Sequence, residues 1–398
     1  MAVIAENRWF YFLMVVFAFV APLSTAAIPI VSGLLLIAWC IRGDLKGSLT
    51  KMLQNPLAIA VFIYALLQIV GLSWSIDEQS GSHKFYLLLM IPVITSVFKK
   101  EWMASTFGAF IVGMAIAEIT SYYKIITGWS IHGGGGASGY SAFMTSISYG
   151  PFLVFTICLV IVSLVEKRGE GNRIWFLWML IAAMIINLFT TGSRAGQLAF
   201  GLLMVLLVVY YFRRHWAALI LMIACIPLLY WGSYMLNPAF KARVDAAVND
   251  VTSFRANENT SVGARMRFVL NSWELIKEKP ILGHGTGSFA HEYARKHTEL
   301  SPTSTTTVNP HNMYILSLVH HGVIGLISLL LLFVAQFYLF STSKEAHYRV
   351  LMMALPLLFM AICFSDSYLL GVRTQALFVL FSGVLFSNEN ISVEARVT

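Results

Sequence analysis

Long apolar stretches separated by short polar segments recur along the whole chain. Each is close to the length of about 20 residues that an α-helix needs to cross the hydrocarbon core of a bilayer. Prolines, glycines and charged residues delimit twelve of them, at residues 9–21, 26–42, 56–73, 85–98, 102–121, 142–165, 174–190, 197–212, 217–235, 313–340, 350–367 and 371–386. The pattern predicts an all-α polytopic membrane protein with about twelve transmembrane helices. A single membrane domain then spans residues 1–398, and a helical loop, residues 236–312, lies between the ninth and tenth helices.

The composition agrees with this assignment. Of the 398 residues, 58% are hydrophobic and 12% are charged, and the mean hydropathy is +0.74, values far from those of a soluble domain. The net charge of +8 would suit a nucleic-acid partner, but the 27 Lys and Arg residues are scattered in short segments and form no dense block. The chain is therefore expected to contact membrane lipids and no nucleic acid.

The distribution of Lys and Arg predicts how the chain is oriented, because these residues are retained on the cytoplasmic side of a membrane. With the N-terminus inside, the inner segments contain 14 of the 27, the short outer loops contain four, and the loop 236–312 contains the other nine. Both termini are therefore expected in the cytoplasm. Arg194, Arg373 and the long loop are expected on the outer face.

The long outer loop has the pattern of two or three helices, in PAFKARVDAAVNDV, SVGARMRFVLNSWELIKEKP and, more weakly, GTGSFAHEYARKH. At about 100° per residue the second helix has an apolar stripe, formed by Met266, Val269, Leu270, Trp273 and Ile276. Arg265 borders this stripe, and Arg267 falls on the polar face. The spacing predicts that Arg265 points towards the bundle and Arg267 towards water; the alternative is that both are solvated.

The tenth apolar stretch is longer than a bilayer requires. From Met313 to Phe340 it has 28 residues, which is about 42 Å of helix against a hydrocarbon core of about 30 Å. It is expected to tilt, to kink near Gly322 or to project outwards. His311 directly follows Pro310 at the outer end of this stretch. A histidine side chain has an ordinary pKa of about 6.5, which suits a general base. A plain surface histidine is the alternative.

Arg194 opens an apolar helix in TTGSRAGQL. An arginine in a membrane helix costs about 2.5–3.5 kcal/mol at the bilayer centre and less near an end, so a partner is expected. Glu118 and Asp366 both lie near outer helix ends and are expected to pair with Arg194 or Arg373. A ligand phosphate is the other candidate partner, because a guanidinium suits two-point binding and the first amides of a helix favour an anion.

Several catalytic motifs are absent from the sequence. It has no P-loop, no G-x-S-x-G or H-E-x-x-H motif, and no D-x-D pair on the outer face. ATP-driven and metal-dependent mechanisms are therefore disfavoured, and no cofactor or metal ion is expected. The remaining candidates are arginines that can neutralise a pyrophosphate and a histidine that can accept a proton.

Three stretches make the chain resemble the O-antigen ligase and polymerase superfamily of bacterial polytopic membrane glycosyltransferases. They are TGSRAG, RMRFVLNSWELIKEKPILGHGTGSF and PHNMYILSLVHHGVIGL. The resemblance covers most of the second half of the chain, whereas the first half is similar in hydropathy only. It implies a GT-C-like fold in the bacterial inner membrane, with the active site on the periplasmic face.

The resemblance also implies an activity and its residues. Members of the superfamily join a glycan carried on undecaprenyl diphosphate to an acceptor, without a metal ion or nucleotide. The matching motifs assign Arg194 and Arg265 to the donor pyrophosphate and His311 to the deprotonation of an acceptor hydroxyl, in one inverting displacement. The supporting positions are Glu118, Asp366, Arg373, Asn312 and Tyr314.

Ligation of O-antigen to lipid A-core, which completes lipopolysaccharide, is the expected reaction. Polymerases of the superfamily typically have two sizeable periplasmic loops where this chain has one, and protein O-oligosaccharyltransferases usually add a C-terminal periplasmic domain. Both activities are alternatives within the superfamily. A flippase for lipid-linked sugars, with Glu118, Asp366 and the arginines along a translocation path, is the alternative from another class.

Overall fold

The described part of the chain folds into helices and connecting turns. The computed structural model describes residues 2–76, 85–128, 143–167, 173–252, 261–301, 306–344 and 346–391. An α-helix pairs its backbone polar groups within one segment, which is why apolar chains adopt it inside a membrane. The α-helices are α1 (Ala2–Val20), α2 (Ala27–Ile41), α3 (Leu45–Gln54), α4 (Pro56–Val70), α6 (Met90–Val97), α7 (Met103–Thr127), α8 (Ser146–Lys167), α9 (Arg173–Thr191), α10 (Arg194–Phe212), α11 (Trp216–Leu236), α12 (Pro238–Thr252), α13 (Ser261–Glu278), α14 (Phe289–Leu300), α15 (Met313–Thr342), α16 (Arg349–Ile362), α17 (Val372–Leu385) and α18 (Asn388–Ile391).

Many of these helices are suited to a bilayer. Within the ranges given above, seven helices are long and apolar enough to cross a membrane, and α2 and α3, bent by 114°, make an eighth span if they are counted as one. Four shorter apolar helices complete the set: Arg8–Val20, Tyr86–Val97, Arg349–Ile362 and Val372–Leu385. Each span predicted from the sequence overlaps one of these segments. The structure therefore agrees with an all-helical polytopic membrane protein, and the number of twelve crossings stays a prediction.

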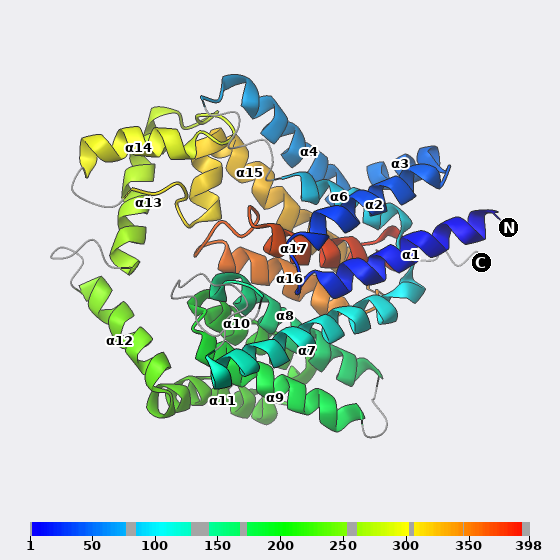
Figure 1. Cartoon of the computed structure of the whole chain (residues 1–398), viewed down its shortest axis with the longest axis horizontal. Coiled ribbons are helices and arrows are strands. Elements are labelled where there is room, and N and C mark those ends of the chain that lie inside the picture. Colours follow the sequence, from blue (N-terminus) through cyan, green and yellow to red (C-terminus); the bar gives the residue numbers. More distant parts are fainter. Residues whose placement is uncertain are drawn as a thin grey trace.

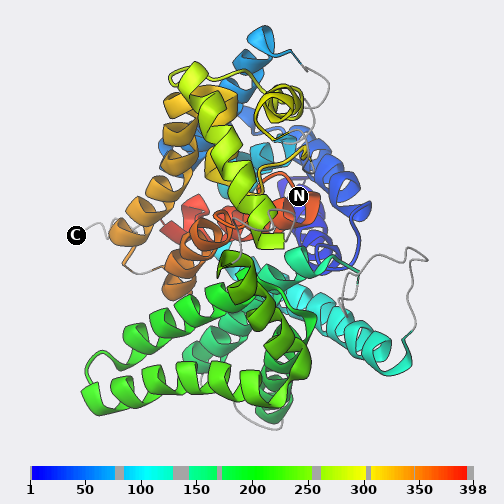
Figure 2. The same ribbon diagram turned by 90° about the vertical axis from the view of Figure 1, so that its left-hand side faces the viewer.

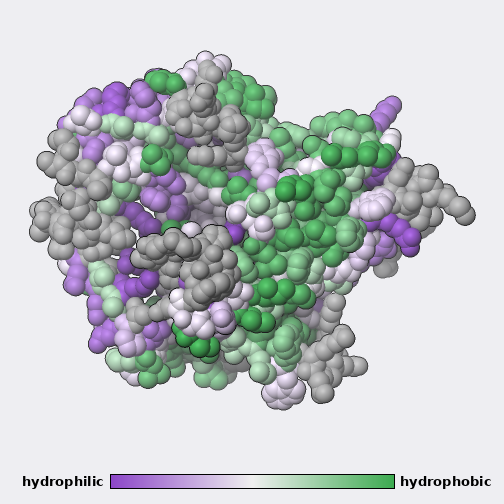
Figure 3. All heavy atoms as spheres, in the orientation of Figure 1, coloured by the Kyte–Doolittle hydropathy of each residue, from purple (hydrophilic) through white to green (hydrophobic). Residues whose placement is uncertain are grey.

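The helices of the long loop lie at one end of the molecule. Figure 1 shows α12, α13 and α14 along the left of the view, while α1 begins at the right. Hydrophobic residues form a band between these ends on the face shown in Figure 3, and the left end is largely hydrophilic. Figure 2 looks onto that end and shows α13 in front of the bundle. This is the arrangement expected of a bundle in a bilayer with an extramembrane segment on one side.

Segments predicted to be cytoplasmic meet one another at a common end of the bundle. The side-chain amide of Asn388 donates a hydrogen bond to the Lys51 carbonyl, at 2.7 Å. The backbone N–H of Lys100 donates to the Glu389 carboxylate, at 2.8 Å. The structure thus groups three segments that the charge distribution places on one side of the membrane. Which side of the membrane this is stays a prediction.

The longest helix, α15, is broken at Gly322, where φ is 60° and ψ is −152°. The loop between α13 and α14 supplies partners for the backbone groups that the break exposes. Val323 N–H donates to the Pro280 carbonyl at 2.8 Å, and His284 N–H donates to the Val319 carbonyl at 2.9 Å. Of the three expected ways to accommodate this long helix, the kink near Gly322 is confirmed. The break also anchors the loop between α13 and α14 to the bundle.

Gly322→Ala is expected to destabilise the protein strongly. This backbone conformation is almost restricted to glycine and costs other residues about 1–3 kcal/mol, and an added Cβ would also overlap the backbone of Ile281. The midpoint of thermal unfolding in detergent should fall by several degrees. Gly108→Ala in α7 is the matched control, because its Cβ would meet open space; an equal effect of both exchanges would contradict the expectation.

The three helices expected in the long loop are present as α12, α13 and α14, but the prediction that Arg267 of α13 points towards water is wrong. Arg267 is only 2% exposed, whereas Leu270 and Trp273 of the apolar stripe are 57% and 55% exposed. The buried face of α13 combines Phe268, Leu275 and Ile276 with polar contacts to α14. Asn271 donates to the Tyr293 hydroxyl of α14 at 3.3 Å, and the positive charge of Arg267 acts on the same hydroxyl. Contacts with α14 therefore bury the face of α13 that carries Arg267.

Candidate active site

The His311 backbone is held in an unusual conformation at the outer end of α15. Its φ of 51° lies in the left-handed region, which non-glycine residues adopt rarely and often at functional sites. The backbone N–H of His311 donates to the side chain of Asn309 at 3.0 Å. Asn312 then caps α15 by accepting hydrogen bonds from the N–H groups of Tyr314 and Ile315, at 3.0 and 3.1 Å. A tight turn before His311 and a helix cap after it thus fix the backbone position from which the His311 side chain extends.

The imidazole of His311 lies between a carboxylate and an aromatic ring. Nδ1 is 3.2 Å from Oδ1 of Asp366, and 32% of the side chain is exposed. The ring stacks on Phe268 of α13, with centroids 6.1 Å apart and an interplanar angle of 28°. Because Nδ1 faces the carboxylate, Nε2 is the nitrogen left for a substrate. A carboxylate at Nδ1 is how catalytic histidines are oriented for proton transfer.

Asp366 lies in the turn between α16 and α17, and hydrogen-bond donors fix its carboxylate. Its Oδ1 accepts from the Ser367 backbone N–H at 2.7 Å and from the Asn309 side chain at 3.4 Å. Burial acts to raise the pKa of the Asp366 carboxyl, but His311, the Ser367 amide and the positive charge of Arg265 outweigh it and hold the pKa below its usual value. The carboxylate is therefore ionised and can stabilise a positively charged imidazole.

Arg265 belongs to the same cluster. It lies on α13, three residues before the Phe268 ring that stacks on His311, and its side chain is half-buried. Its positive charge acts on the Asp366 carboxyl and on the Tyr368 hydroxyl. The structure thus brings together His311, Asp366 and Arg265, which are far apart in the sequence.

Arg194 is the first residue of α10 and lines a cavity of its own. The Ser193 hydroxyl caps the helix by accepting from Gly196 N–H at 3.3 Å, which confirms that Arg194 opens a helix. The Arg194 side chain donates to the backbone carbonyl of Arg243 at 3.5 Å. Both arginines line a cavity of about 490 Å³ whose wall does not include His311. A pyrophosphate clamp formed jointly by Arg194 and Arg265, as the resemblance implies, accordingly stays a prediction.

The central and following part of the chain, from α9 to α15, matches a known family in sequence. Residues 179–330 match the family described as O-antigen ligase. This region belongs to the O-antigen ligase superfamily. The match includes Arg194, Arg265 and His311 and ends before Asp366.

One curated relative resembles part of the chain. It is an uncharacterized protein of Haemophilus influenzae, 28% identical over 202 residues, and the match covers 48% of this chain and 49% of the relative. The chain therefore spans about half the length of the curated relative that it matches.

Two of the predicted supporting residues do not join the cluster. Glu118 is buried at 3% exposure and accepts from the Tyr149 hydroxyl at 2.7 Å. Arg373 donates to the backbone carbonyl of Phe143. The expectation was pairing with Arg194 or Arg373, but Glu118 contacts Tyr149 through Oε2 and Asp366 contacts His311 through Oδ1. Glu118 stabilises the packing of α7 on α8.

Asn312 and Tyr314 connect the start of α15 to the segment that carries Asp366. The Asn312 side chain donates to the Phe364 carbonyl at 3.1 Å, and the Tyr314 hydroxyl donates to the Met360 carbonyl at 2.8 Å. Both therefore help to set the distance between His311 and Asp366. Asn309 contacts both His311 and Asp366, but it is not among the site residues predicted from the sequence. The Asn-Pro turn signal just before His311 is the feature of the sequence from which Asn309 could have been found.

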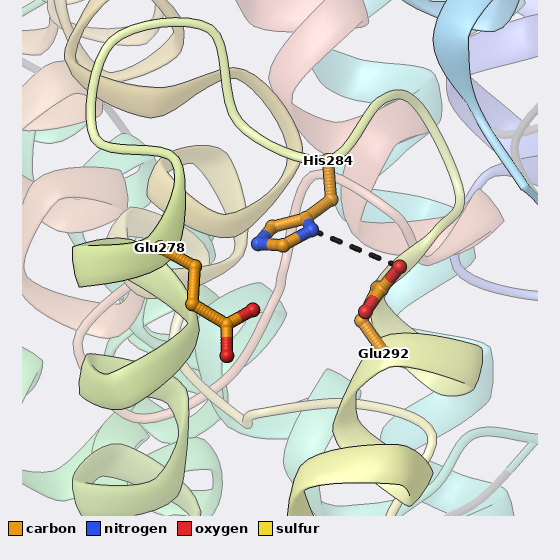
Figure 4. A group of neighbouring side chains, drawn as sticks. All are labelled: Glu278, His284 and Glu292. Carbon is orange, nitrogen blue, oxygen red and sulfur yellow. Dashed lines mark ion pairs between the residues drawn. The ribbon is translucent and has the colours of Figure 1, made fainter.

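One group of side chains has donors that suit a metal ion. The ligand atoms of Glu278, His284 and Glu292 lie within 4.8 Å of one another (Figure 4), and His284 Nδ1 is 3.7 Å from a Glu292 oxygen. Arg295 contacts Glu278 at 2.5 Å and Glu292 at 3.0 Å, while Lys296 contacts Glu278 at 2.6 Å. A metal ion would have to displace these cations from both carboxylates. The group therefore fits better as an ion-pair network that joins α13 to α14.

Proposed function

We propose that this protein is an O-antigen ligase, a glycosyltransferase that transfers O-antigen polysaccharide from undecaprenyl diphosphate to lipid A-core. The reaction takes place at the periplasmic face of the bacterial inner membrane and completes lipopolysaccharide. The contact between His311 and Asp366 carries the proposal, since a base oriented by a carboxylate is what activation of a sugar hydroxyl requires. The O-antigen ligase family match supports the substrate class.

The reaction is a single displacement at the anomeric carbon of the donor. His311 Nε2 accepts the proton of an acceptor hydroxyl, and Asp366 stabilises the imidazolium that forms. The hydroxyl oxygen forms the new bond to the anomeric carbon while the bond from that carbon to the diphosphate oxygen breaks. Undecaprenyl diphosphate leaves with the electron pair, and the configuration at the carbon inverts.

The leaving diphosphate requires positive charge. Arg265, whose charge acts on Asp366, and Arg194, at the start of α10, are the proposed donors to its oxygens. Charge-assisted hydrogen bonds that strengthen as the leaving group develops negative charge lower the barrier. In this mechanism arginines supply the electrostatic stabilisation, so no cofactor takes part in the displacement.

Arg194→Lys is expected to lower ligation about tenfold. Lysine keeps the charge but loses the planar fork that binds two diphosphate oxygens, and one charge-assisted hydrogen bond contributes about 1.5–3 kcal/mol. The measurement is the initial rate with purified protein in liposomes. Arg214→Lys is the matched control, because Arg214 is exposed in the turn that follows the C-terminal end of α10. An undiminished rate for Arg194→Lys would show that a point charge suffices.

Reconstitution tests the function itself. The purified full chain is mixed with undecaprenyl-diphosphate-linked O-antigen and lipid A-core, with EDTA present. A lipopolysaccharide product is expected, and its absence would overturn the ligase proposal. A product made only on a second lipid-linked glycan would identify a polymerase, and one made only on a peptide would identify an oligosaccharyltransferase. Transfer of the donor across the bilayer without product would identify a flippase.

A further inference from the structure

Arg243 on α12 packs against the turn that carries Arg194. Its guanidinium donates a hydrogen bond to the Gly192 carbonyl at 2.8 Å. Gly192 has a φ of 71°, and a Cβ at this position would overlap the Arg243 guanidinium. Glycine at 192 therefore serves two purposes, because it adopts the left-handed conformation and leaves room for the arginine.

The contacts between this turn and α12 run in both directions. Arg243 donates through its side chain to Gly192, and Arg194 donates through its own side chain to the Arg243 carbonyl, at 3.5 Å. Only Ser193, the helix cap, separates Gly192 from Arg194. The position of the Arg194 guanidinium is therefore coupled to that of Arg243.

The two arginines also share a cavity of about 490 Å³. Most of its remaining wall is apolar, formed by Leu198, Tyr230, Phe240, Val244 and Val248. Two guanidinium groups beside an apolar wall suit an amphiphile in which a diphosphate is attached to a hydrocarbon chain. A free anion without a hydrocarbon chain would leave the apolar wall of this cavity without a partner.

We propose that Arg243 is a donor-binding residue that holds Arg194 in place and supplies a second positive charge to the lipid-linked diphosphate. This inference rests on the proposed function, which provides a donor of that class. It differs from the clamp inferred from the sequence, because the structure pairs Arg194 with Arg243 on α12. Arg265, whose charge acts on Asp366, remains the proposed donor to the diphosphate on the His311 side.

Binding of farnesyl diphosphate to the purified full chain in nanodiscs tests the inference. Arg243→Ala is expected to weaken binding at least about tenfold, as expected for loss of a charge-assisted contact. Arg243→Lys should bind with intermediate affinity, because it keeps the charge and loses the fixed contact to Gly192. Lys241→Ala is the matched control, since Lys241 is an exposed basic residue on the same helix. Wild-type affinity in Arg243→Ala, or no binding by the wild-type protein, would overturn the inference.

Two further measurements separate binding from folding and from the ligase proposal. Gly192→Ala keeps Arg243 but displaces its guanidinium, so it should weaken farnesyl diphosphate binding in the same direction. In ligation assays, Arg243→Ala should raise the KM for the donor about tenfold and leave the KM for the acceptor unchanged. A fall in kcat alone would indicate loss of folded protein and count against the inference. Binding of farnesyl diphosphate needs no acceptor. A failed ligation assay would therefore overturn the proposed function without deciding whether Arg243 binds the lipid-linked diphosphate.

Discussion

His311→Ala is expected to lower kcat for transfer to lipid A-core by about 10²–10⁴-fold, the usual contribution of a positioned general base. The exchange removes Nε2, the proposed proton acceptor, and leaves Asp366 without the ring that it orients. The KM for the donor should change little, because the arginines that bind the diphosphate are retained. Initial rates at saturating donor and acceptor measure the effect.

Two variants show whether the loss at position 311 is catalytic. His311→Asn tolerates the left-handed backbone better than alanine does, so it should fold like the wild-type protein and still lose activity. His291→Ala removes an exposed histidine of α14 and should be fully active. A wild-type rate for His311→Ala would eliminate His311 as the base and leave it at most a residue that orients the acceptor.

The elements of the fold could be predicted because their signals are local. Apolar runs of membrane length identified every segment that the structure forms as an apolar helix. Ser193 and Asn312 also stand where N-caps are favoured, and both cap their helices. The kink near Gly322 was among the expected outcomes because the apolar stretch is longer than a bilayer requires and contains a glycine. Both properties can be read within this one stretch.

The faces of α13 could not be predicted from periodicity alone. An apolar stripe is normally buried in a soluble helix, but here Leu270 and Trp273 are exposed. Arg267 is buried instead, because α14 provides Tyr293 as a partner for that face. The spacing of apolar residues describes one helix, whereas burial depends on the helix that packs against it.

The partners of the two acidic residues, Glu118 and Asp366, could not be predicted from the sequence either. Charge arithmetic favours arginine as the partner of a carboxylate near a membrane, yet Asp366 contacts His311 and Glu118 contacts Tyr149. Asp366 and His311 are 55 positions apart in the chain, and the packing of α15 on α16 brings them together. Arg243 lacked any motif of its own, since its role depends on the backbone of Gly192.

Asp366→Asn is expected to reduce kcat by about 10²-fold or more. Asparagine keeps the size of the side chain but has no charge to stabilise the imidazolium, and its amide can hold the imidazole in the wrong tautomer. Because the pKa of Asp366 is held below its usual value, the carboxylate stays ionised well below neutral pH. Loss of activity between pH 7 and 5 should therefore not arise from protonation of Asp366. Glu299→Gln, at an exposed acidic residue of α14, should keep its activity.

The double variant His311→Ala/Asp366→Asn determines whether Asp366 acts through the histidine. Residues that work as a unit show strongly non-additive effects on kcat. If Asp366 serves only to orient and charge-stabilise His311, the double variant should be no slower than His311→Ala alone. Additive losses would mean that Asp366 contacts the substrate itself, and the carboxylate would then be a second candidate for the base. In that case the 3.2 Å contact between Nδ1 and Oδ1 would describe two separate catalytic groups and not an oriented pair.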